Sequence, residues 1–283
     1  MKNIRIILLL LISVSVFANV SPSEKKALVK LYESTNGQNW TKKWDLKSPV
    51  ESWAGVKVVA DKVVALDLAN NNLNGQLPKE LGNLTNIEQI NLFRNNLSGS
   101  IPSSIGNLKH LKSLNIAFNK LSGSLPASLG DAAALQSVEL YMNRIEGELP
   151  SSIGKLAQLQ TLSLFNNELT GAIPSSFYSL KSLKVLLLSS NKLSGKLSIE
   201  VANLSSLENL SLFENNMEGQ VPFDLEKLRN LKEMNISYNK FNGLVSKNLA
   251  ELDMMNMTMI NEHGVATTLK VDLNKNSALA ADE

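Results

Sequence analysis

Cysteine is absent from the 283-residue chain, and histidine occurs twice, as His110 and His263. A chain without cysteine forms no disulfide and offers neither a thiol nucleophile nor a cysteine-ligated metal. The two histidines are far apart in sequence, and neither belongs to a Ser/His/Asp or HExxH pattern. We therefore expect no catalytic residue, no metal, no cofactor and no enzymatic activity, and a stability that comes from packing alone.

Long apolar runs are also lacking after the first 18 residues. Those residues join Lys2 and Arg5 to the apolar run "IILLLLISVSVF", which ends near Val16 and Ala18, where a signal peptidase would cut. Such a segment predicts a secretory signal peptide over residues 1–18, and thus a secreted, periplasmic or cell-surface protein. An uncleaved membrane anchor is the alternative, although the run is short for an ordinary span.

The mature chain has no excess of either charge. Loss of Lys2 and Arg5 would leave 26 basic residues, which equals the 26 acidic ones. A balanced chain offers no general electrostatic attraction for nucleic acid or for anionic lipid. We expect neither as a partner, no membrane contact after signal cleavage, and a monomer.

What the chain has in abundance is repetition with a period of 24 residues. A glycine follows each repeated asparagine by four residues, and an L-x-x-L-x-L frame precedes each asparagine. A fixed period of this length predicts a solenoid, in which no copy buries its leucines alone. The eight asparagines are Asn71, Asn95, Asn119, Asn143, Asn167, Asn191, Asn215 and Asn239.

Each repeated position has a physical role. The L-x-L alternation predicts a short strand, and stacked copies would form a parallel sheet along a concave face. The asparagine amide both donates and accepts, so eight of them predict a ladder that satisfies turn backbone inside the coils. The glycine allows a backbone angle or close approach that a side chain would block. The following proline, present in six copies, predicts an extended entry into a short 3₁₀ or helical turn on the outer side.

The motif L-x-x-L-x-L-x-x-N-x-L-x-G-x-I-P-x-x-[LI]-G-x-L resembles the plant-type leucine-rich repeat over residues 63–252. The resemblance extends to "SWAGVKVVADKVV", although Lys57 and Val58 stand where the plant cap motif has a cysteine. That departure favours the bacterial members that resemble the plant type. The resemblance implies an α/β repeat solenoid: a leucine-rich-repeat horseshoe with a parallel concave β-sheet and with N- and C-terminal caps. Family members include receptor ectodomains and polygalacturonase-inhibiting proteins.

Four segments are expected. Residues 1–18 are the signal peptide, 19–62 the N-terminal cap, 63–253 the eight repeats, and 254–283 a C-terminal cap with a frayed tail. In the first cap, Ser21 to Glu24 reads as a capping box that starts a helix. Trp40, Trp44 and Trp53 supply apolar mass over the first coil, with a sugar-stacking site as the alternative. Methionines close the last coil, with a soft-metal site as the alternative.

The candidate ligand site is a strip on the concave face. Two adjacent positions after the last strand leucine vary between copies, and six aromatic residues fall there. Strand alternation predicts that they project outward, where aromatics favour binding over solubility. The alternative is that they only shield strand ends. The predicted ligand-binding residues are Phe93, Arg94, Phe118, Glu139, Tyr141, Phe165, Phe213, Glu214 and Tyr238.

The leading interpretation is an exported recognition module for a protein, peptide or polysaccharide, in which Arg94, Glu139 and Glu214 set partner choice. An inhibitor of a secreted carbohydrate-active enzyme is an alternative of the same kind. Binding of ice or a crystal surface is a second alternative, but glutamates interrupt the row of small residues before the glycines, at Glu146 and Glu218. A glycosidase-like pair of carboxylates is a third, weakened by lysines interspersed on the same face.

Overall fold

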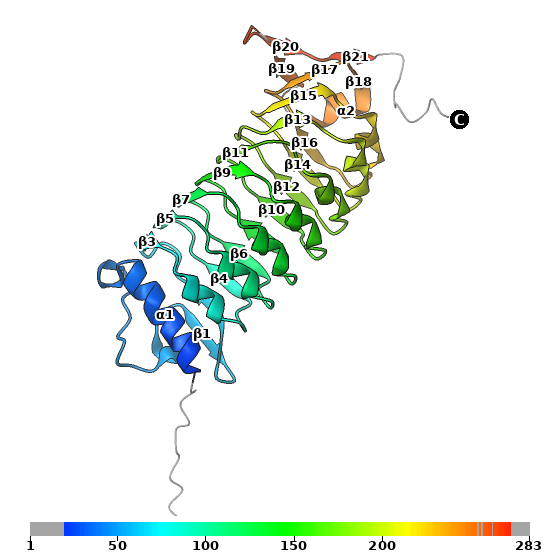
Figure 1. Ribbon diagram of the computed structural model, residues 1–283. Helices are drawn as coiled ribbons and strands as arrows, with labels where there is room; N and C mark the ends of the chain where they lie inside the picture. Colours follow the sequence, from blue (N-terminus) through cyan, green and yellow to red (C-terminus); the bar gives the residue numbers. More distant parts are fainter. Residues whose placement is uncertain (1–19, 254, 256, 262, 273–283) are drawn as a thin grey trace, which may run out of the picture.

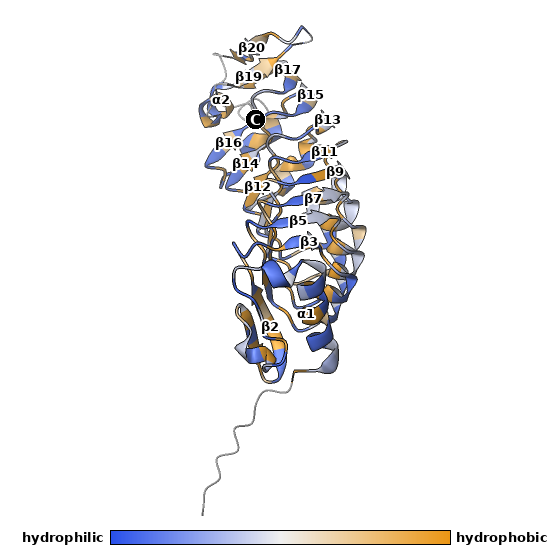
Figure 2. Ribbon diagram, turned by 90° about the vertical axis from the view of Figure 1, so that its left-hand side faces the viewer, coloured by the Kyte–Doolittle hydropathy of each residue, from blue (hydrophilic) through white to orange (hydrophobic). Residues whose placement is uncertain are grey.

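The computed structural model describes residues 20–253, 255, 257–261 and 263–272. The expected signal peptide, residues 1–18, lies outside this range. Coils stack in one column from helix α1 (Pro22–Ser34) at one end to strands β19 (Thr258–Ile260), β20 (Ala266–Thr268) and β21 (Lys270–Asp272) at the other (Figures 1 and 2). No helix within the described ranges is long and apolar enough to cross a membrane.

One sheet of nine strands runs the length of the stack, in the order β1-β2-β4-β6-β8-β10-β12-β14-β16. Apart from the antiparallel β1–β2 pair, neighbours are parallel and in register, so Leu114 of β6 lies opposite Val138 of β8. We call the outward-facing side of this sheet the concave face. Its strands are β1 Val56–Val59, β2 Lys62–Asp67, β4 Gln89–Asn91, β6 Ser113–Asn115, β8 Ser137–Glu139, β10 Thr161–Ser163, β12 Val185–Leu187, β14 Asn209–Ser211 and β16 Glu233–Asn235.

A second row of strands follows the asparagines, which sequence analysis did not predict. The chain leaves each asparagine in an extended conformation until the repeated glycine turns it at positive φ, for example 78° at Gly147. Parallel pairing of these segments forms sheets of five and three strands. The strands are β3 Asn74–Gln76, β5 Asn96–Gly99, β7 Lys120–Gly123, β9 Arg144–Glu148, β11 Glu168–Thr170, β13 Ser194–Lys196, β15 Asn216–Gln220 and β17 Lys240–Asn242.

The outer side consists of short 3₁₀ helices, as the sequence predicts. In the repeats, a proline or serine in an extended conformation precedes each of these helices. Neighbouring helices approach so closely that a Cβ on Gly82 would lie 2.4 Å from the Ser104 carbonyl oxygen. Two 3₁₀ helices belong to the N-terminal cap, η1 Gly37–Asn39 and η2 Val50–Ser52. The seven that belong to the repeats are η3 Lys79–Asn83, η4 Ser103–Asn107, η5 Ala127–Asp131, η6 Ser151–Lys155, η7 Ser175–Ser179, η8 Ile199–Asn203 and η9 Phe223–Lys227.

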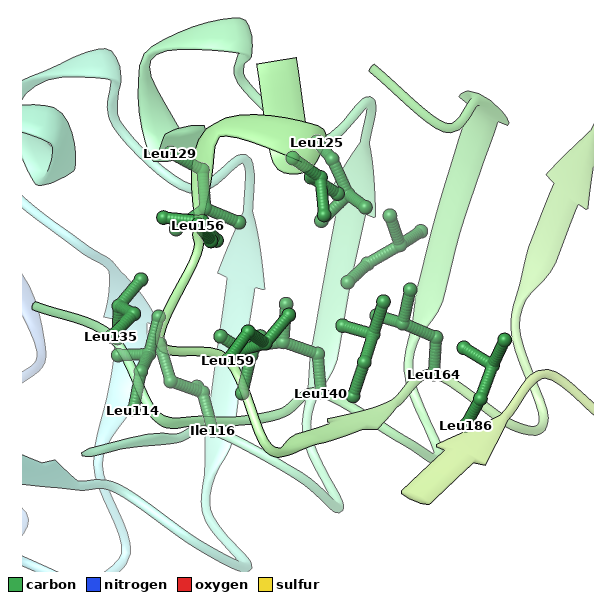
Figure 3. Close-up of a cluster of buried hydrophobic side chains, with 14 of the residues drawn as sticks. Leu114, Ile116, Leu125, Leu129, Leu135, Leu140, Leu156, Leu159, Leu164 and Leu186 are labelled. Atoms are coloured by element: carbon green, nitrogen blue, oxygen red, sulfur yellow. The ribbon is translucent and has the colours of Figure 1, made fainter. Parts of the chain in front are cut away.

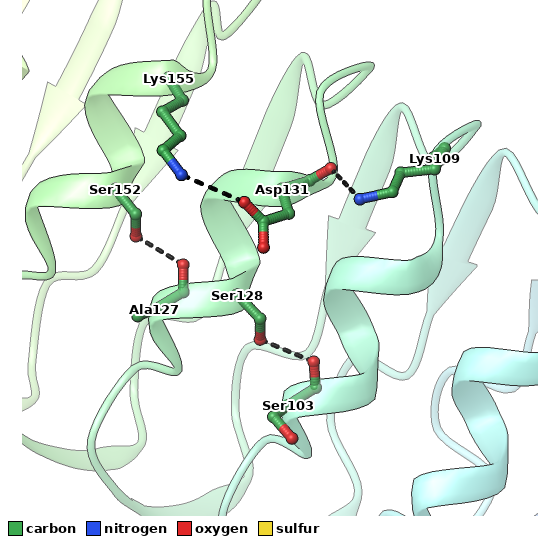
Figure 4. A network of polar contacts seen from close by, with 7 residues as sticks. All are labelled: Ser103, Lys109, Ala127, Ser128, Asp131, Ser152 and Lys155. Carbon is green, nitrogen blue, oxygen red and sulfur yellow. Dashed lines mark hydrogen bonds and ion pairs between the residues drawn. The ribbon is translucent and has the colours of Figure 1, made fainter.

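Two ladders of side-chain hydrogen bonds hold the coils together. The predicted asparagine ladder is confirmed: the Asn143 amide donates to the carbonyls of Ile116 and Leu140 and accepts from the Leu121 N–H at 2.9 Å. A second ladder lies on the outer side, where the hydroxyl of Ser128 donates to the Ser103 carbonyl at 2.6 Å and Ser152 repeats the contact one coil later (Figure 4). Between the ladders the leucines fill one continuous core (Figure 3).

The N-terminal cap closes the first coil with aromatic side chains. Ser21 accepts from the Glu24 N–H at the start of α1, and the buried Glu24 carboxylate accepts from the Val63 N–H of β2. Trp40, Trp44 and Trp53 are all buried, and their rings pack in a chain with centroids 4.8–4.9 Å apart. The capping interpretation of the tryptophans is therefore confirmed, and the sugar-stacking alternative is wrong because no ring face is open to solvent.

At the other end, the last coil gives way to β18 (Leu244–Ser246) and helix α2 (Lys247–Leu252). The buried Asp253 carboxylate accepts from the backbone N–H groups of Ile236 and Met257 at 2.8 and 3.0 Å, which ties the cap to β16. Met257 and Met259 are buried, as the capping interpretation predicts. Strands β20 and β21 follow within the same cap.

Candidate functional site

The predicted aromatic strip lies just past the ends of the concave strands. We define it as Phe93, Phe118, Tyr141, Phe165, Phe213 and Tyr238. Four of these, Phe93, Tyr141, Phe165 and Phe213, follow the strand leucine directly and are half-buried. Strand alternation explains their outward direction, because the preceding leucine points into the core.

Phe118 and Tyr238 reach the same surface for a different reason, and here the sequence argument was wrong. Alternation would turn them inward. Instead the backbone is left-handed at this position in all eight coils, with φ of 54° at Phe118 and 58° at Tyr238. Arg94 and Glu214 share that conformation. This turn sends the side chain out to solvent, and Phe118 is 41% exposed. No glycine or invariant asparagine marks the turn, so the sequence held no signal for it.

The rings form two clusters rather than one run. Phe93 packs edge-on against Phe118 with centroids 5.4 Å apart, and Phe118 against Tyr141 at 5.6 Å. Tyr141 then stacks on Phe165 at 4.5 Å with ring planes 10° apart. The sixth coil has Ser189 at this position, and beyond it Phe213 and Tyr238 pair at 5.2 Å.

The charged residues predicted for the site lie along this strip. The Glu139 carboxylate accepts from the Asn115 amide at 3.2 Å and from the Ser137 hydroxyl at 3.1 Å. Partial burial raises the pKa of the Tyr141 phenol above its ordinary value, and the negative charge of Glu139 raises it further. Glu214 accepts from the Ser190 hydroxyl at 2.6 Å. The structure thus places Glu139 with the four-ring cluster and Glu214 with the two-ring cluster.

Other carboxylates near the concave face are ion-paired between coils. Lys112 lies 2.7 Å from Glu88, and Lys232 lies 2.5 Å from Glu208. The hydrogen bond from each lysine lowers the pKa of its glutamate and so favours the ionised carboxylate. Within the described part of the chain, no three His, Asp or Glu side chains come together as a metal site would require.

Sequence reasoning left Met142 out of the site, although it belongs there by position. It occupies the left-handed position one coil after Phe118 and is 38% exposed. Phe118, Met142 and Tyr238 are three of the eight large hydrophobic side chains exposed among the described residues. Exposure of apolar side chains is therefore concentrated at one repeat position, which was visible in the sequence as a column.

Family models match most of the chain. A model described as "Leucine-rich repeat region" matches residues 128–271. A second, described as "Leucine Rich Repeat", matches residues 62–84, 86–108 and 110–132.

Solved plant structures share this architecture. The leucine-rich-repeat ectodomain of the receptor kinase GASSHO1/SCHENGEN3 from Arabidopsis thaliana, in complex with CASPARIAN STRIP INTEGRITY FACTOR 2, is 29% identical with a TM-score of 0.78; the match covers 88% of this chain and 30% of that one. A plant peptide hormone receptor, RGFR1 in complex with RGF2, is 28% identical with a TM-score of 0.65, over 73% and 32%. The chain thus spans about a third of the length of these receptors.

A plant ice-binding protein also matches in fold. It is 22% identical with a TM-score of 0.55, and the match covers 91% of this chain and 100% of that one. At this identity the likeness concerns the fold alone.

Proposed function

Because the chain belongs to the leucine-rich-repeat family, we propose that it is an exported, non-enzymatic recognition module that binds a peptide segment on its concave face. The observation that carries the proposal is the four-ring cluster of Phe93, Phe118, Tyr141 and Phe165. Aromatic side chains bury large areas on binding at a low cost in conformational entropy. The plant peptide hormone receptor of similar architecture, in complex with RGF2, supports the same class of ligand.

Ring packing favours a peptide over a polysaccharide. A sugar ring binds to an open aromatic face, and a flat platform of two neighbouring rings needs centroids farther apart than the ring width. Tyr141 and Phe165 instead stack at 4.5 Å, so each ring blocks one face of the other. Ring edges and the Phe118 side chain suit the irregular apolar side chains of a peptide.

The charges of the strip would select among peptides. Among the described residues, neither Glu139 nor Glu214 has a cationic partner. Glu139 lies beside the four-ring cluster and Glu214 beside the two-ring cluster. Arg94 directly follows Phe93, at the other end of the four-ring cluster. We propose that basic side chains of the ligand face the glutamates and that an acidic one faces Arg94. Charges at an interface set specificity and association rate more than affinity.

A screen with two arms tests the ligand class. The immobilised mature chain is offered a display library of random twelve-residue peptides and, separately, an array of plant and bacterial polysaccharides. We expect enrichment of peptides that combine an aromatic or aliphatic residue with lysine or arginine. Binding confined to polysaccharides would reject the peptide proposal while leaving recognition intact.

Ice binding is the runner-up from a different class, because an ice-binding protein shares the fold. Lattice binding needs identical small groups in every coil, and Glu146 and Glu218 interrupt the row before the glycines. A thermal-hysteresis assay separates the two, and we expect no activity.

Export is part of the proposal and has its own test. We expect removal of residues 1–18, with Asn19 as the first residue of the secreted form by mass spectrometry. An intact Met1 on membrane-bound protein would contradict it.

A further inference from the structure

A groove of about 1130 Å³ lies at the C-terminal end of the stack, away from the concave face. One wall is β17, the last strand of its sheet, and the other is the β19–β20 hairpin. The basic residues that line it are Lys196, Lys240, Lys270 and His263, whereas Glu218 is the one acidic residue among the described lining residues. The groove therefore carries a net positive charge.

The course of the chain explains why the groove exists. Residues 258–260 continue the stack beyond the eighth coil, because Tyr238 N–H donates to the Thr258 carbonyl at 2.6 Å and Ile260 N–H donates to the Asn239 carbonyl at 2.7 Å. The chain then turns at Asn261, whose N–H donates to the Val265 carbonyl, and returns as β20 antiparallel to β19. The chain therefore turns away from β17 at the point where a ninth coil would have added the next strand of the sheet.

The register across the sheet specifies what would fit beside β17. Lys196 of β13 lies opposite Glu218 of β15, and Glu218 lies opposite Lys240 of β17. Opposite charges on directly opposed residues stabilise neighbouring strands. Within the described residues no ion pair engages Lys196, Glu218 or Lys240, so the register alone sets the alternation of charge along this row. An acidic residue opposite Lys240 would continue this alternating row.

The two following positions are specified in the same way. Phe241 is buried beside Met259, so the residue opposite it would point inward and be apolar. Asn242 lies opposite Gln220 and is exposed, so its partner would be polar. Beyond them, Lys270 lies opposite Leu244, which is 45% exposed. Because β21 occupies the sheet edge from Leu244 onward, a second acidic residue would follow the added strand and face Lys270.

We infer that this groove binds an acidic peptide segment, which adds to β17 as a parallel strand with the pattern acidic–apolar–polar and a further acidic residue beyond. Backbone hydrogen bonds to the sheet edge provide the affinity of such strand addition, and alternate side chains provide its specificity. A polyanionic sugar shares the charge but has no peptide backbone to pair with β17. The site is independent of the concave face.

The probe is the labelled peptide acetyl-Ser-Glu-Val-Asn-Val-Glu-Ser-amide, and its affinity for the mature chain is measured by fluorescence anisotropy. Lys240→Glu should weaken binding at least about tenfold, because it puts like charges opposite each other. Lys120→Glu is the matched control, since Lys120 holds the same repeat position in β7, which has strands on both sides. We expect this control to bind within about twofold of the wild type.

Two further arms separate strand addition from simple charge attraction. N-methylation of alternate peptide amides removes backbone donors but keeps both glutamates, and it should weaken binding at least about tenfold. Equal binding of the methylated peptide, or of polygalacturonate in its place, would overturn the inference. So would a dimer that dissociates in the Lys240→Glu variant, because the occupant would then be a second copy of the chain.

Discussion

The rings of Tyr141 and Phe165 stack with their centroids 4.5 Å apart and their planes 10° from parallel. Both residues occupy the same position in adjacent coils, and both are half-buried on the concave face. The spacing of parallel strands, about 4.8 Å, brings the rings together without any special geometry in the loops. The pair is therefore both a small element of stability and the centre of the proposed ligand site.

A double-mutant cycle measures the stability part. Tyr141→Ala and Phe165→Ala should be coupled by about 0.5–1.5 kcal/mol in the free energy of unfolding, as stacked aromatic pairs are. Urea denaturation of the two single variants and the double variant gives this value. Strictly additive effects would show that the stacking contributes nothing.

Loss of one ladder asparagine should cost much more than loss of its neighbour. Asn143→Ala leaves the buried carbonyls of Ile116 and Leu140 without their amide donor, which costs about 1–3 kcal/mol. Arg144→Ala is the matched control, because Arg144 is exposed in the same coil. Asn72, which follows the ladder residue Asn71, is a poorer control. Its φ is 59° and its amide donates to the Asn39 carbonyl, so its loss would remove other stabilising contacts. Equal denaturation midpoints for the Asn143 and Arg144 variants would contradict the ladder.

The left-handed turn predicts an unusual ranking of substitutions at Met142, where φ is 56°. Asparagine tolerates this conformation, whereas a β-branched residue does not. Met142→Val should therefore be about 1–2 kcal/mol less stable than Met142→Asn, although valine is the better match in hydrophobicity. Denaturant titration of both variants checks this, and the reverse order would mean that the coil turns differently.

The phenol of Tyr141 should titrate above its ordinary pKa of 10. The folded state favours the protonated phenol, so its contribution to stability is present below the ordinary pKa and is lost as pH rises through the raised value. A difference absorbance titration of the wild type against Tyr141→Phe isolates this group. Glu139→Gln should bring the pKa part of the way down, because burial remains. An unshifted phenol would contradict both the partial burial of the ring and its closeness to Glu139.

Sequence alone predicted the features that repeat. The 24-residue spacing of Asn143 and its seven equivalents was enough for the solenoid, the ladder, the concave sheet and the outer 3₁₀ helices, because each role follows from residue chemistry at a fixed position. The second row of strands was missed because "NxLxG" contains a single apolar residue, which is too few to indicate a strand. Strand pairing there comes from stacking in register, which is a property of neighbouring coils and not of any one segment.

The candidate site was predictable in membership but not in shape. Six aromatics in two adjacent columns marked the strip, yet the sequence did not say that Phe118 and Tyr238 point outward through a left-handed turn. Ser189 and Ser190 marked the gap between the two clusters, but the contacts of Phe118 with Phe93 and Tyr141 depend on ring packing across coils. The groove beside β17 depends on the turn at Asn261, which no repeat position encodes.

The most direct test of the proposed function is the affinity of a peptide selected on the wild-type chain, measured by calorimetry against the Tyr141→Ala/Phe165→Ala double variant. Ile199→Ala is the control, because Ile199 is 67% exposed on the outer side in η8. We predict a loss of at least about tenfold in affinity for the double variant, with a melting temperature within a few degrees of the wild type, and no change for the control. Unchanged affinity in the double variant would contradict the concave site, and a collapsed melting temperature would show that the rings belong to the core.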